Sequence, residues 1–524
     1  MRTLEELLRS LLQKELTCEF FEILNQVPNK IPLEELLKKW GSETISALVY
    51  NSNDAKENAL FVAIKGYKSD GHKFIASAIR NGMRVVFGEE RPENLEWPSD
   101  ALYIQTDDSR SALATLAKSF YGASIDRLRA VGVTGTNGKT TTATLIHQVL
   151  EHSHIKAGLL GTVSYQIGEM RIEADRTTPE APELHHFFEV MEKEMCKAVV
   201  MEVSSHALYL KRTEGINFEV AIFTNLTQDH LDFHGTMALY AEAKKILFDG
   251  LTSSATAITN IASPYGEMMI RDTKAKVLRY LVNSKNESEK KASLAAIADV
   301  RFMIEKASLL GSEISVHFSG AVLKFHLPQV GQFNVENAAA AFCAGLAMGL
   351  EPNTILEGIE SCQAVRGRME KVISPKGNLA FVDYAHTPDA LENVLKTIVE
   401  NRESNERIIV IFGCGGDRDK GKRPLMAKIA ESYADIVILT SDNPRSEDPE
   451  MILDDIQAGL EGKKQIMRIA SREKAIELGV SLLDSKSVLL VAGKGHETYQ
   501  ILGKEKLHFD DREEIEKAYR KLDR

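Results

Sequence analysis

The chain has 524 residues, more than one compact core accommodates, so its length predicts about three or four domains. Hydrophobic residues make up 44% and charged residues 27%, as in ordinary soluble globular proteins. The net charge of −11 argues against a duplex-binding surface, which needs a dominant basic patch, and we expect no nucleic-acid partner.

The cysteines and the N-terminus indicate the compartment. The five cysteines are scattered without a C-x-x-C pair, which is typical of reduced cytoplasmic thiols and not of disulfides or a zinc site. The first residues, "MRTLEELLRSLLQKE", predict a charged amphipathic helix and not a secretory signal. No apolar run reaches the length of about 18 residues that predicts a membrane span. We therefore expect a cytoplasmic monomer without a membrane span.

Residues 1–125 form the first of three predicted α/β blocks. Apolar strand patterns alternate there with helical patterns at 72–82 and 109–122. The predicted strands cover residues 59–64, 83–88 and 101–106.

The second block, residues 126–364, opens with a strand pattern that runs into a helix at 139–152. The apolar stretch 338–350 predicts a buried helix, and the charged stretch 283–293 predicts an exposed insertion. Further predicted strands cover residues 197–203, 218–225 and 255–260.

The third block, residues 365–524, alternates strands and helices, which predicts βαβ units and a largely parallel sheet. Polar segments follow its strands at 383–390, 413–423, 440–449 and 493–500. Ligands bind outside the carboxyl ends of such strands, so these loops predict one ligand-binding rim. The predicted strands cover residues 378–384, 407–413, 434–440, 465–470 and 487–493.

The segment "VGVTGTNGKTTT", Val131 to Thr142, predicts a phosphate-binding loop between a strand and a helix. Lys139 would reach the β- and γ-phosphates of a nucleotide, and the Thr140 hydroxyl would meet Mg²⁺. The spacing departs from G-x-x-x-x-G-K-[ST], because position 133 is Val and Gly132 comes one residue early. An ordinary glycine turn is the alternative.

Two later strand ends carry candidate metal ligands. Glu202 in "MEVSSH" could bind Mg²⁺, which prefers oxygen ligands. The segment "TNLTQDHLDFHG" offers His230 and His234, spaced as in a zinc helix but without the glutamate of H-E-x-x-H. Hydrogen bonding within the loop is the alternative for each histidine.

Other polar residues are ambiguous from spacing alone. The adjacent Lys244 and Lys245 are predicted to be solvated lysines of a plain helix. Asn337, placed at the start of the apolar helix, is either a helix cap or a nucleotide contact. Arg366 and Arg368 lie at a predicted domain junction, where cations could meet an anionic transition state.

Taken together, these motifs resemble the Mur ligase family. The resemblance covers about residues 50 to 515, with the motifs in family order. In the second block and the entry to the third it rests on "GTNGKTT", "MEVSSH", "TNLTQDHLDFHG", "YAEAKKILF", "GQFNVENAAAA", "GRME" and "FVDYAHTPDAL". "FGCGGDRDKGKRPLM", "SDNPRSEDP", "VAGKGHETYQ" and "FDDRE" are similar to the branch that adds the third residue of the peptidoglycan stem peptide.

The resemblance implies a three-domain α/β fold. The central domain would have a P-loop-type, mostly parallel sheet with helices on both faces, flanked by a smaller N-terminal α/β domain and a C-terminal Rossmann-like domain. With boundaries near residues 126 and 365, residues 1–125 would bind a UDP-sugar, 126–364 ATP, and 365–524 the incoming amino acid.

The resemblance also implies an ATP and Mg²⁺ site. Mg²⁺ would be held by Thr140, Glu202, His230 and Lys244, and Lys244 matches the lysine that the family carries as a carbamate. This overrides the prediction of a solvated Lys244 but not that of Lys245. Lys139, Lys244, Glu202, His230 and Arg368 would be the catalytic residues. ATP would contact Gly135, Thr136, Asn137, Gly138, Lys139, Thr140, Thr141, Asn337, Arg368, Asp383 and Tyr384.

The implied reaction is ATP-dependent amide formation with release of ADP. The D-Glu carboxylate of UDP-MurNAc-L-Ala-D-Glu would form an acyl phosphate, which meso-diaminopimelate would attack. No protein nucleophile is needed. The nucleotide-sugar would contact Tyr50, Ser52, Tyr67, Lys68, Ser69, Thr177, Thr178, Ser204 and Arg212. Departures from the family occur at Leu210, near the sugar-peptide, and at "NIASPYG", where the family often has two acidic residues.

Diaminopimelate is distinguished from lysine by a distal carboxylate, which a guanidinium can bind bidentately. Arg445 is predicted to bind that carboxylate, Arg418 the other carboxylate, and Glu497 the distal ammonium. The implied subsite contains Arg418, Asp442, Asn443, Pro444, Arg445, Gly493 and Glu497. A lysine-adding ligase, a folylpolyglutamate-synthase-like ligase and a nucleotide-binding module without ligase activity are the alternatives.

Overall fold

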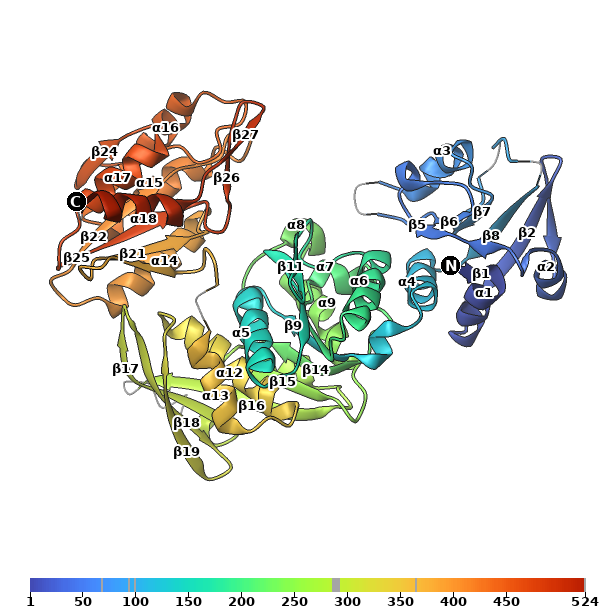
Figure 1. Cartoon of the computed structure of the whole chain (residues 1–524), viewed down its shortest axis with the longest axis horizontal. Coiled ribbons are helices and arrows are strands. Elements are labelled where there is room, and N and C mark those ends of the chain that lie inside the picture. Colours follow the sequence, from blue (N-terminus) through green and yellow to red (C-terminus); the bar gives the residue numbers. More distant parts are fainter. Residues whose placement is uncertain (67–68, 93–94, 99, 285–292, 363–364, 523–524) are drawn as a thin grey trace. The chain divides into compact units, whose positions relative to one another are not determined.

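The computed structural model describes residues 1–66, 69–92, 95–98, 100–284, 293–362 and 365–522 (Figure 1). The chain divides into two compact units. The first consists of Met1–Tyr280 and Ala340–Ile355, and the second of Leu281–Ala339 and Leu356–Arg524. No helix among the described residues is long and apolar enough to cross a membrane.

The N-terminal part of the first unit is a six-stranded sheet in the order β3-β2-β8-β7-β6-β5. It is parallel from β5 to β8 and antiparallel where β2 meets β3 and β8. Side chains alternate between two cores: Leu102 and Ile104 of β8 face one, and Ala101 and Tyr103 the other. Its elements are β1 (Arg2–Thr3), α1 (Leu4–Gln13), β2 (Cys18–Leu24), β3 (Val27–Ile31), α2 (Leu33–Trp40), β4 (Thr44–Ile45), β5 (Ala47–Val49), β6 (Ala59–Val62), α3 (Ile75–Arg80), β7 (Val85–Gly88), β8 (Asp100–Thr106) and α4 (Ser109–Phe120).

The rest of the first unit is built on strands in the order β12-β11-β10-β13-β9-β14-β15-β16. From β10 to β16 the neighbours are parallel, and β11 and β12 add an antiparallel hairpin. Helices α6 and α9 share a core with one face of these strands, and α5 contacts β9, β10 and β13. The elements are β9 (Arg129–Thr134), α5 (Lys139–His152), β10 (Ala157–Leu160), β11 (Ser164–Ile167), β12 (Met170–Glu173), α6 (Ala181–Lys193), β13 (Ala198–Glu202), α7 (Ser205–Tyr209), β14 (Phe218–Phe223), α8 (Leu231–His234), α9 (Met237–Asp249), β15 (Thr256–Asn260), α10 (Gly266–Ile270) and β16 (Lys276–Ser284).

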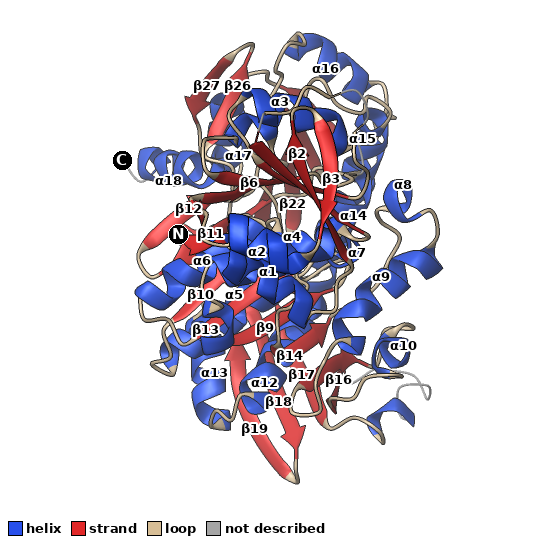
Figure 2. Ribbon diagram, turned by 90° about the vertical axis from the view of Figure 1, so that its right-hand side faces the viewer, coloured by secondary structure: helices blue, strands red, loops and turns tan. Residues whose placement is uncertain are grey.

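In the second unit, β17, β18 and β19 form an antiparallel meander, visible as long adjacent strands in Figure 2. A six-stranded sheet follows in the order β20-β21-β25-β22-β23-β24, in which only β20 is antiparallel to its neighbour. Successive residues of β22 alternate between two cores, one formed with α14, α15 and α16 and the other with α17 and α18.

The helices and strands of this part of the chain are β17 (Val300–Ser308), β18 (Gly311–Phe318), β19 (Ala321–Leu327), α12 (Gln332–Ala347), α13 (Pro352–Ser361), β20 (Glu370–Ile373), β21 (Leu379–Asp383), α14 (Pro388–Asn401), β22 (Arg407–Phe412), α15 (Lys422–Tyr433), β23 (Ile436–Leu439), α16 (Pro449–Gln457), β24 (Gln465–Arg468), α17 (Arg472–Ser481), β25 (Ser487–Ala492), β26 (Tyr499–Leu502), β27 (Glu505–His508) and α18 (Asp511–Leu522).

The predicted α/β fold is confirmed, and the helix at 139–152 has the predicted bounds. The predicted cap at Asn337 is wrong, because α12 begins at Gln332 and Asn337 lies inside it, donating to Oδ1 of Asn334 over 3.3 Å. Most of the predicted exposed insertion, residues 285–292, lies outside the described residues.

Candidate active site

The predicted phosphate-binding loop joins the end of β9 to the start of α5. Its two glycines have positive φ, 152° at Gly135 and 86° at Gly138, and Gly138 is the N-cap of α5. Gly135 has no room for a side chain, because an added Cβ would lie 1.9 Å from Oγ1 of Thr224. Thr140 and Thr141 lie in the first turn of α5. A helix N-terminus behind a glycine turn is suited to binding an anion.

The loop is held by the segment after β14. The N–H of Thr136 donates to the carbonyl of Asn225 (2.9 Å), and the N–H of Asn137 donates to the Asn225 side-chain oxygen (3.0 Å). Nζ of Lys139 donates to the carbonyls of Gly135 (2.9 Å) and Thr136 (2.8 Å). The Lys139 ammonium therefore lies over the loop, where it could exchange carbonyl partners for phosphate oxygens.

Lys244 approaches the same loop from α9. It is only 1% exposed, its Nζ donates to the carbonyl of Gly135 over 2.9 Å, and it lies 4.6 Å from the centre of the Tyr240 ring. Burial, followed by the charge of Lys139, holds the pKa of Lys244 well below its usual value. The prediction of a solvated lysine from spacing is therefore wrong for Lys244. Lys245 is partly exposed and pairs with aspartates at positions 249 and 272.

Glu202 ends β13, next to β9 in the sheet. It is buried, and its two oxygens accept from the N–H (2.8 Å) and the hydroxyl (3.1 Å) of Thr162. An added Cβ on Gly161 would lie 2.4 Å from Oε1 of Glu202, so glycine is needed there. Thr162, which the sequence interpretation missed, thus orients the predicted metal-binding carboxylate.

The two candidate histidines have different environments. His230 precedes α8 with a φ of 52°, and its ring centre lies 4.8 Å from that of His206. Burial lowers the pKa of His230, which keeps its imidazole neutral and able to bind a metal. His234 is buried, its Nε2 lies 2.9 Å from the Ser205 hydroxyl, and its pKa falls to about 4 through burial. The two side chains therefore do not form the zinc pair considered above.

Four of the residues expected to contact the nucleotide-sugar lie together. The Thr178 hydroxyl donates to the Glu202 carbonyl (2.8 Å) and accepts from the N–H of Ser204 (3.1 Å). Arg212 donates to the Thr178 carbonyl (3.0 Å), and the Thr177 hydroxyl lies 3.0 Å from that of Thr162. These bonds attach the predicted sugar-peptide contacts to the strand end that carries Glu202.

The other residues expected to contact the nucleotide-sugar belong to the N-terminal part. The Tyr50 hydroxyl donates to Glu183 of α6 over 2.8 Å, Ser52 is buried, and the Ser69 carbonyl accepts from the N–H at position 66. Tyr67 and Lys68 lie outside the described residues. Arg110 of α4, which the sequence interpretation missed, donates to the Leu210 carbonyl over 3.1 Å. At Leu210 this contact uses the main chain and does not depend on the side chain.

In the second unit, Arg368 and Tyr384 lie together, with the guanidinium 5.6 Å from the ring centre. The Tyr384 ring also lies 4.8 Å from that of His496. The carboxylate of Asp383 accepts from the N–H groups at positions 369 (2.7 Å) and 385 (2.8 Å), and its burial raises its pKa. Asp383 therefore shapes the chain around Arg368 and Tyr384. Arg366 instead forms an ion pair with Asp510.

Arg445 lies in the loop between β23 and α16 and has a φ of 53°. Its N–H donates to the Ile501 carbonyl (3.1 Å), its carbonyl accepts from the N–H of Gly503 (2.8 Å), and its guanidinium donates to the Gly416 carbonyl (2.8 Å). The hairpin of β26 and β27 thus fixes the Arg445 main chain, which the sequence interpretation missed. The loop ends where Asp448 caps α16.

The other residues predicted for the amino-acid subsite differ in their exposure and in their contacts. Arg418 is exposed, and Asp442 is buried, which raises the pKa of its carboxyl. Gly493, with a φ of 117°, is needed because an added Cβ would lie 2.6 Å from Oδ2 of Asp442. Glu497 accepts from the Asn443 side chain over 2.8 Å. The main chain of Pro444 lies close to Gly416, since a Cβ added to Gly416 would be 1.9 Å from the Pro444 carbonyl oxygen.

A fully buried arginine binds the loop that carries Arg445 through ion pairs. Arg423 of α15 binds both oxygens of Glu447, at 2.9 and 3.0 Å, and Asp455 at 2.8 Å. Glu447 also accepts from the N–H of Asp417 over 2.6 Å. The loops at 413–423 and 440–449, predicted to share a rim, are therefore joined by hydrogen bonds.

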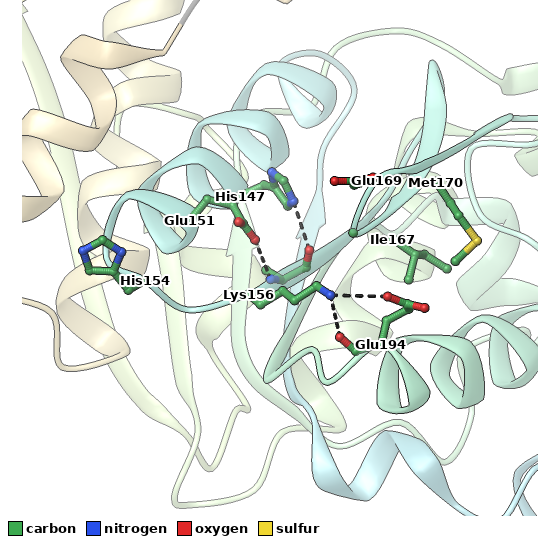
Figure 3. Close-up of a pocket in the computed structure, with 10 residues that line it drawn as sticks. His147, Glu151, His154, Lys156, Ile167, Glu169, Met170 and Glu194 are labelled. Carbon is green, nitrogen blue, oxygen red and sulfur yellow. Dashed lines mark hydrogen bonds and ion pairs between the residues drawn. The ribbon is translucent and has the colours of Figure 1, made fainter.

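A cavity of about 900 Å³ lies at a different place, between the end of α5 and the β11–β12 turn (Figure 3). Ala157, the first residue of β10, lines this cavity. In the sheet it pairs with Ala198, which pairs with Arg129, so all three residues start their strands, whereas the phosphate loop follows the other end of β9. Two of the polar side chains that line the cavity, Lys156 and Glu194, bind each other. Since it lies away from the loops that carry the predicted ligands, it is not the candidate site.

Three family descriptions match the sequence. "Mur ligase family, catalytic domain" matches residues 44–121, "Mur ligase middle domain" residues 133–345, and "Mur ligase, glutamate ligase domain" residues 367–495.

Curated relatives are similar over nearly the whole chain. A protein of Chlorobium phaeobacteroides is 43% identical over 509 residues, 95% of this chain and 96% of the relative. One of Chlorobaculum tepidum is 42% identical over 479 residues, 91% and 93% of the two chains. Both are named UDP-N-acetylmuramoyl-L-alanyl-D-glutamate--2,6-diaminopimelate ligase. A solved structure of a protein with the same name matches with a TM-score of 0.68 and 31% identity, covering 93% of this chain and 97% of that one.

Proposed function

Because the chain belongs to the Mur ligase family, we propose that it is the ATP-dependent ligase that adds 2,6-diaminopimelate to UDP-N-acetylmuramoyl-L-alanyl-D-glutamate in peptidoglycan synthesis. The γ-carboxylate of D-glutamate attacks the γ-phosphate of ATP and forms an acyl phosphate and ADP. The amine of meso-diaminopimelate then attacks the acyl carbon, a tetrahedral intermediate forms, and phosphate leaves. The protein contributes positioning and charge stabilisation, so no nucleophilic side chain is required.

The observation that carries the ligase proposal is the burial of Lys244 against the phosphate loop. Helix N-termini and glycine turns occur in many nucleotide-binding proteins, but a buried lysine bonded to the loop carbonyl of Gly135 is not needed for binding alone. Its lowered pKa favours the uncharged amine, which is the form that reacts with CO₂. A carbamate at Lys244 would place an anion where the structure has a cation.

The chemistry of the proposed metal ligands suits Mg²⁺ when Lys244 is a carbamate. Thr140, Glu202 and the carbamate offer oxygen ligands, which Mg²⁺ prefers, and His230 offers a neutral imidazole. With an unmodified Lys244 ammonium the fit fails, because a cation would face the metal. When bound, Mg²⁺ would neutralise charge on the phosphate oxygens. Lys139 would bind the same oxygens from the helix side, and Arg368 is proposed as a further ATP contact.

Arg445 supports diaminopimelate as the incoming amino acid. Its main chain is fixed by the β26–β27 hairpin, which leaves the guanidinium poised to exchange the Gly416 carbonyl for a carboxylate. Lysine has no distal carboxylate and would leave this cation unpaired, at a cost of about 2–5 kcal/mol. Arg418 is exposed and is proposed to bind the other carboxylate.

Several finer proposals accompany this function. The nucleotide-sugar lies against Tyr50, Thr178, Ser204 and Arg212, and the three domains divide near residues 126 and 365. The enzyme uses small-molecule substrates, and we propose that it works as a cytoplasmic monomer.

The test is phosphate release from ATP in the presence of the UDP-dipeptide and one amino acid at a time. We expect release with meso-diaminopimelate, and a kcat/KM for L-lysine at least about 100-fold lower. Release with neither amino acid would refute the ligase, and equal rates would refute the role of Arg445. Release with a folate and glutamate instead would favour a folylpolyglutamate-synthase-like enzyme.

A further inference from the structure

Lys494 is a buried charge for which the proposed reaction so far has no role. It follows Gly493 in the loop after β25, and its side chain is 0% exposed. Burying an ammonium is unfavourable unless it is paired and hydrogen-bonded. Its partners therefore indicate why a lysine lies there.

The partners of Lys494 come from the predicted amino-acid subsite. Nζ lies 3.1 Å from Oε2 of Glu497 and 3.2 Å from Oδ1 of Asn443, and it lies 5.5 Å from the centre of the Tyr499 ring. One ammonium thus joins the loop after β25 to the loop that carries Arg445.

These contacts fix the orientation of the Asn443 amide. Oδ1 accepts from the Lys494 ammonium and from the N–H of Ile501 (3.0 Å), and both groups can only donate. Nδ2 must then face the carboxylate of Glu497, to which it donates over 2.8 Å. Asn443 therefore serves mainly to connect the loops, since its carbonyl is occupied by the protein.

The same contacts divide the Glu497 carboxylate into two unequal halves. Oε2 accepts from both Lys494 and Asn443, whereas Oε1 has no hydrogen-bond partner within the described part of the chain. The Glu497 side chain is 16% exposed, so its carboxylate is mostly buried but still reaches the surface. An ammonium group is the chemical partner that such an oxygen would take.

We propose that Lys494 is a positioning residue for the incoming amino acid: it clamps Asn443 and one oxygen of Glu497, so that the other oxygen is presented to the distal ammonium of the substrate. This role rests on the proposed function and adds the group that holds the ammonium subsite. Without Lys494, the Glu497 carboxylate keeps one donor, Nδ2 of Asn443. The Asn443 side-chain oxygen in turn keeps one of its two donors, so Asn443 itself is held less firmly.

The experiment compares meso-diaminopimelate with 2-aminopimelate, which lacks only the distal amine. In the unaltered enzyme the ratio of kcat/KM for the two measures the contact at Glu497. We expect Lys494→Met to raise the KM for diaminopimelate by about ten- to a hundred-fold and to bring the ratio close to that of Glu497→Gln. The KM values for ATP and the UDP-dipeptide should stay within about two-fold, because those ligands do not touch the clamp.

A double variant separates positioning from a general structural effect. If Lys494 acts through Glu497, adding Glu497→Gln to Lys494→Met should change the ratio little further, and independent effects would multiply. Lys371→Met is the matched control, because Nζ of this partly buried lysine donates to the carbonyls of Leu310 (2.8 Å) and Pro328 (2.6 Å) and, among the described residues, to no side chain. It should leave the ratio unchanged.

Should Lys494→Met fail to fold, Lys494→Gln keeps an amide donor on a side chain one atom shorter and without the charge, and it should still lower the ratio. An unchanged ratio in a folded Lys494 variant would overturn the proposal. A parent enzyme inactive with diaminopimelate would instead refute the proposed function itself.

Discussion

Nζ of Lys244 lies 2.9 Å from the carbonyl oxygen of Gly135, so a buried lysine contacts the loop that is predicted to hold phosphates. A second lysine approaches this loop, because Lys139 donates to the same carbonyl. Converting Lys244 into an anionic carbamate would place opposite charges side by side and create a metal ligand. This arrangement leads to the first prediction.

Activity should depend on CO₂ through Lys244. Its pKa is lowered by burial, so the neutral amine that reacts with CO₂ is present above that lowered value and is lost as the pH falls below it. Enzyme kept in CO₂-free buffer should lose phosphate release and regain it with bicarbonate. Lys244→Met should lower kcat by at least about 100-fold and abolish the bicarbonate effect. Lys245→Met, one residue further along α9, should retain both, and full activity without CO₂ would contradict the carbamate.

Arg445→Ala should weaken diaminopimelate binding selectively. Losing a guanidinium–carboxylate pair should raise the KM for diaminopimelate by about 100-fold, while the KM for ATP stays unchanged. Arg407→Ala is a suitable control, because Arg407 lies at the start of β22 and pairs with Asp484 over 2.7 Å. A large loss of ATP binding in Arg445→Ala would contradict the assigned role.

Gly135→Ala should abolish nucleotide binding. The added Cβ would lie 1.9 Å from Oγ1 of Thr224, so the loop would have to move away from its anchor after β14. Gly349→Ala is the matched control: its φ is also positive, at 78°, but nothing lies within 4 Å of an added Cβ. Titration with a fluorescent ATP analogue should show binding in the control and none in Gly135→Ala. Equal affinities would show that the loop is not where ATP binds.

Acid should remove the stabilising effect of Glu447. Its hydrogen bonds, first among them those from Arg423, lower its pKa from the ordinary 4.5 to about 2. A carboxyl whose pKa is lower in the folded state stabilises the fold above its unfolded pKa, and this contribution is lost as the pH falls to the folded pKa. Thermal unfolding should therefore show Glu447→Gln less stable than the parent at pH 7 and equal to it near pH 2. A difference that stays constant with pH would refute the linkage.

Sequence patterns predicted the parallel strands well because these strands are buried on both faces. Continuous apolar runs such as that of β22 are fully covered by two cores, and each is followed by a polar loop. The meander of β17 to β19 was missed, since its strands mix exposed polar and buried apolar residues.

Lys244 was misread from spacing although a signal was present. Tyr240, Leu247 and Phe248 are among the buried positions of α9, and Lys244 lies one turn from each of them on the same face. A lysine on the apolar face of a helix is an exception to the expectation that helix lysines are solvated. Lys494 had no comparable signal, because its partner Asn443 lies 51 residues away along the chain and is brought to it only by the sheet.

The left-handed backbone conformation of Arg445 lowers the stability of the fold at a position whose side chain is proposed to be needed for activity. Such a conformation costs a residue with a side chain about 1 kcal/mol, and glycine adopts it freely. Arg445→Gly should therefore melt no lower than the parent, or slightly higher, while losing discrimination for diaminopimelate. A library screened only for heat resistance would accumulate glycine there, and a library screened for growth would keep the arginine.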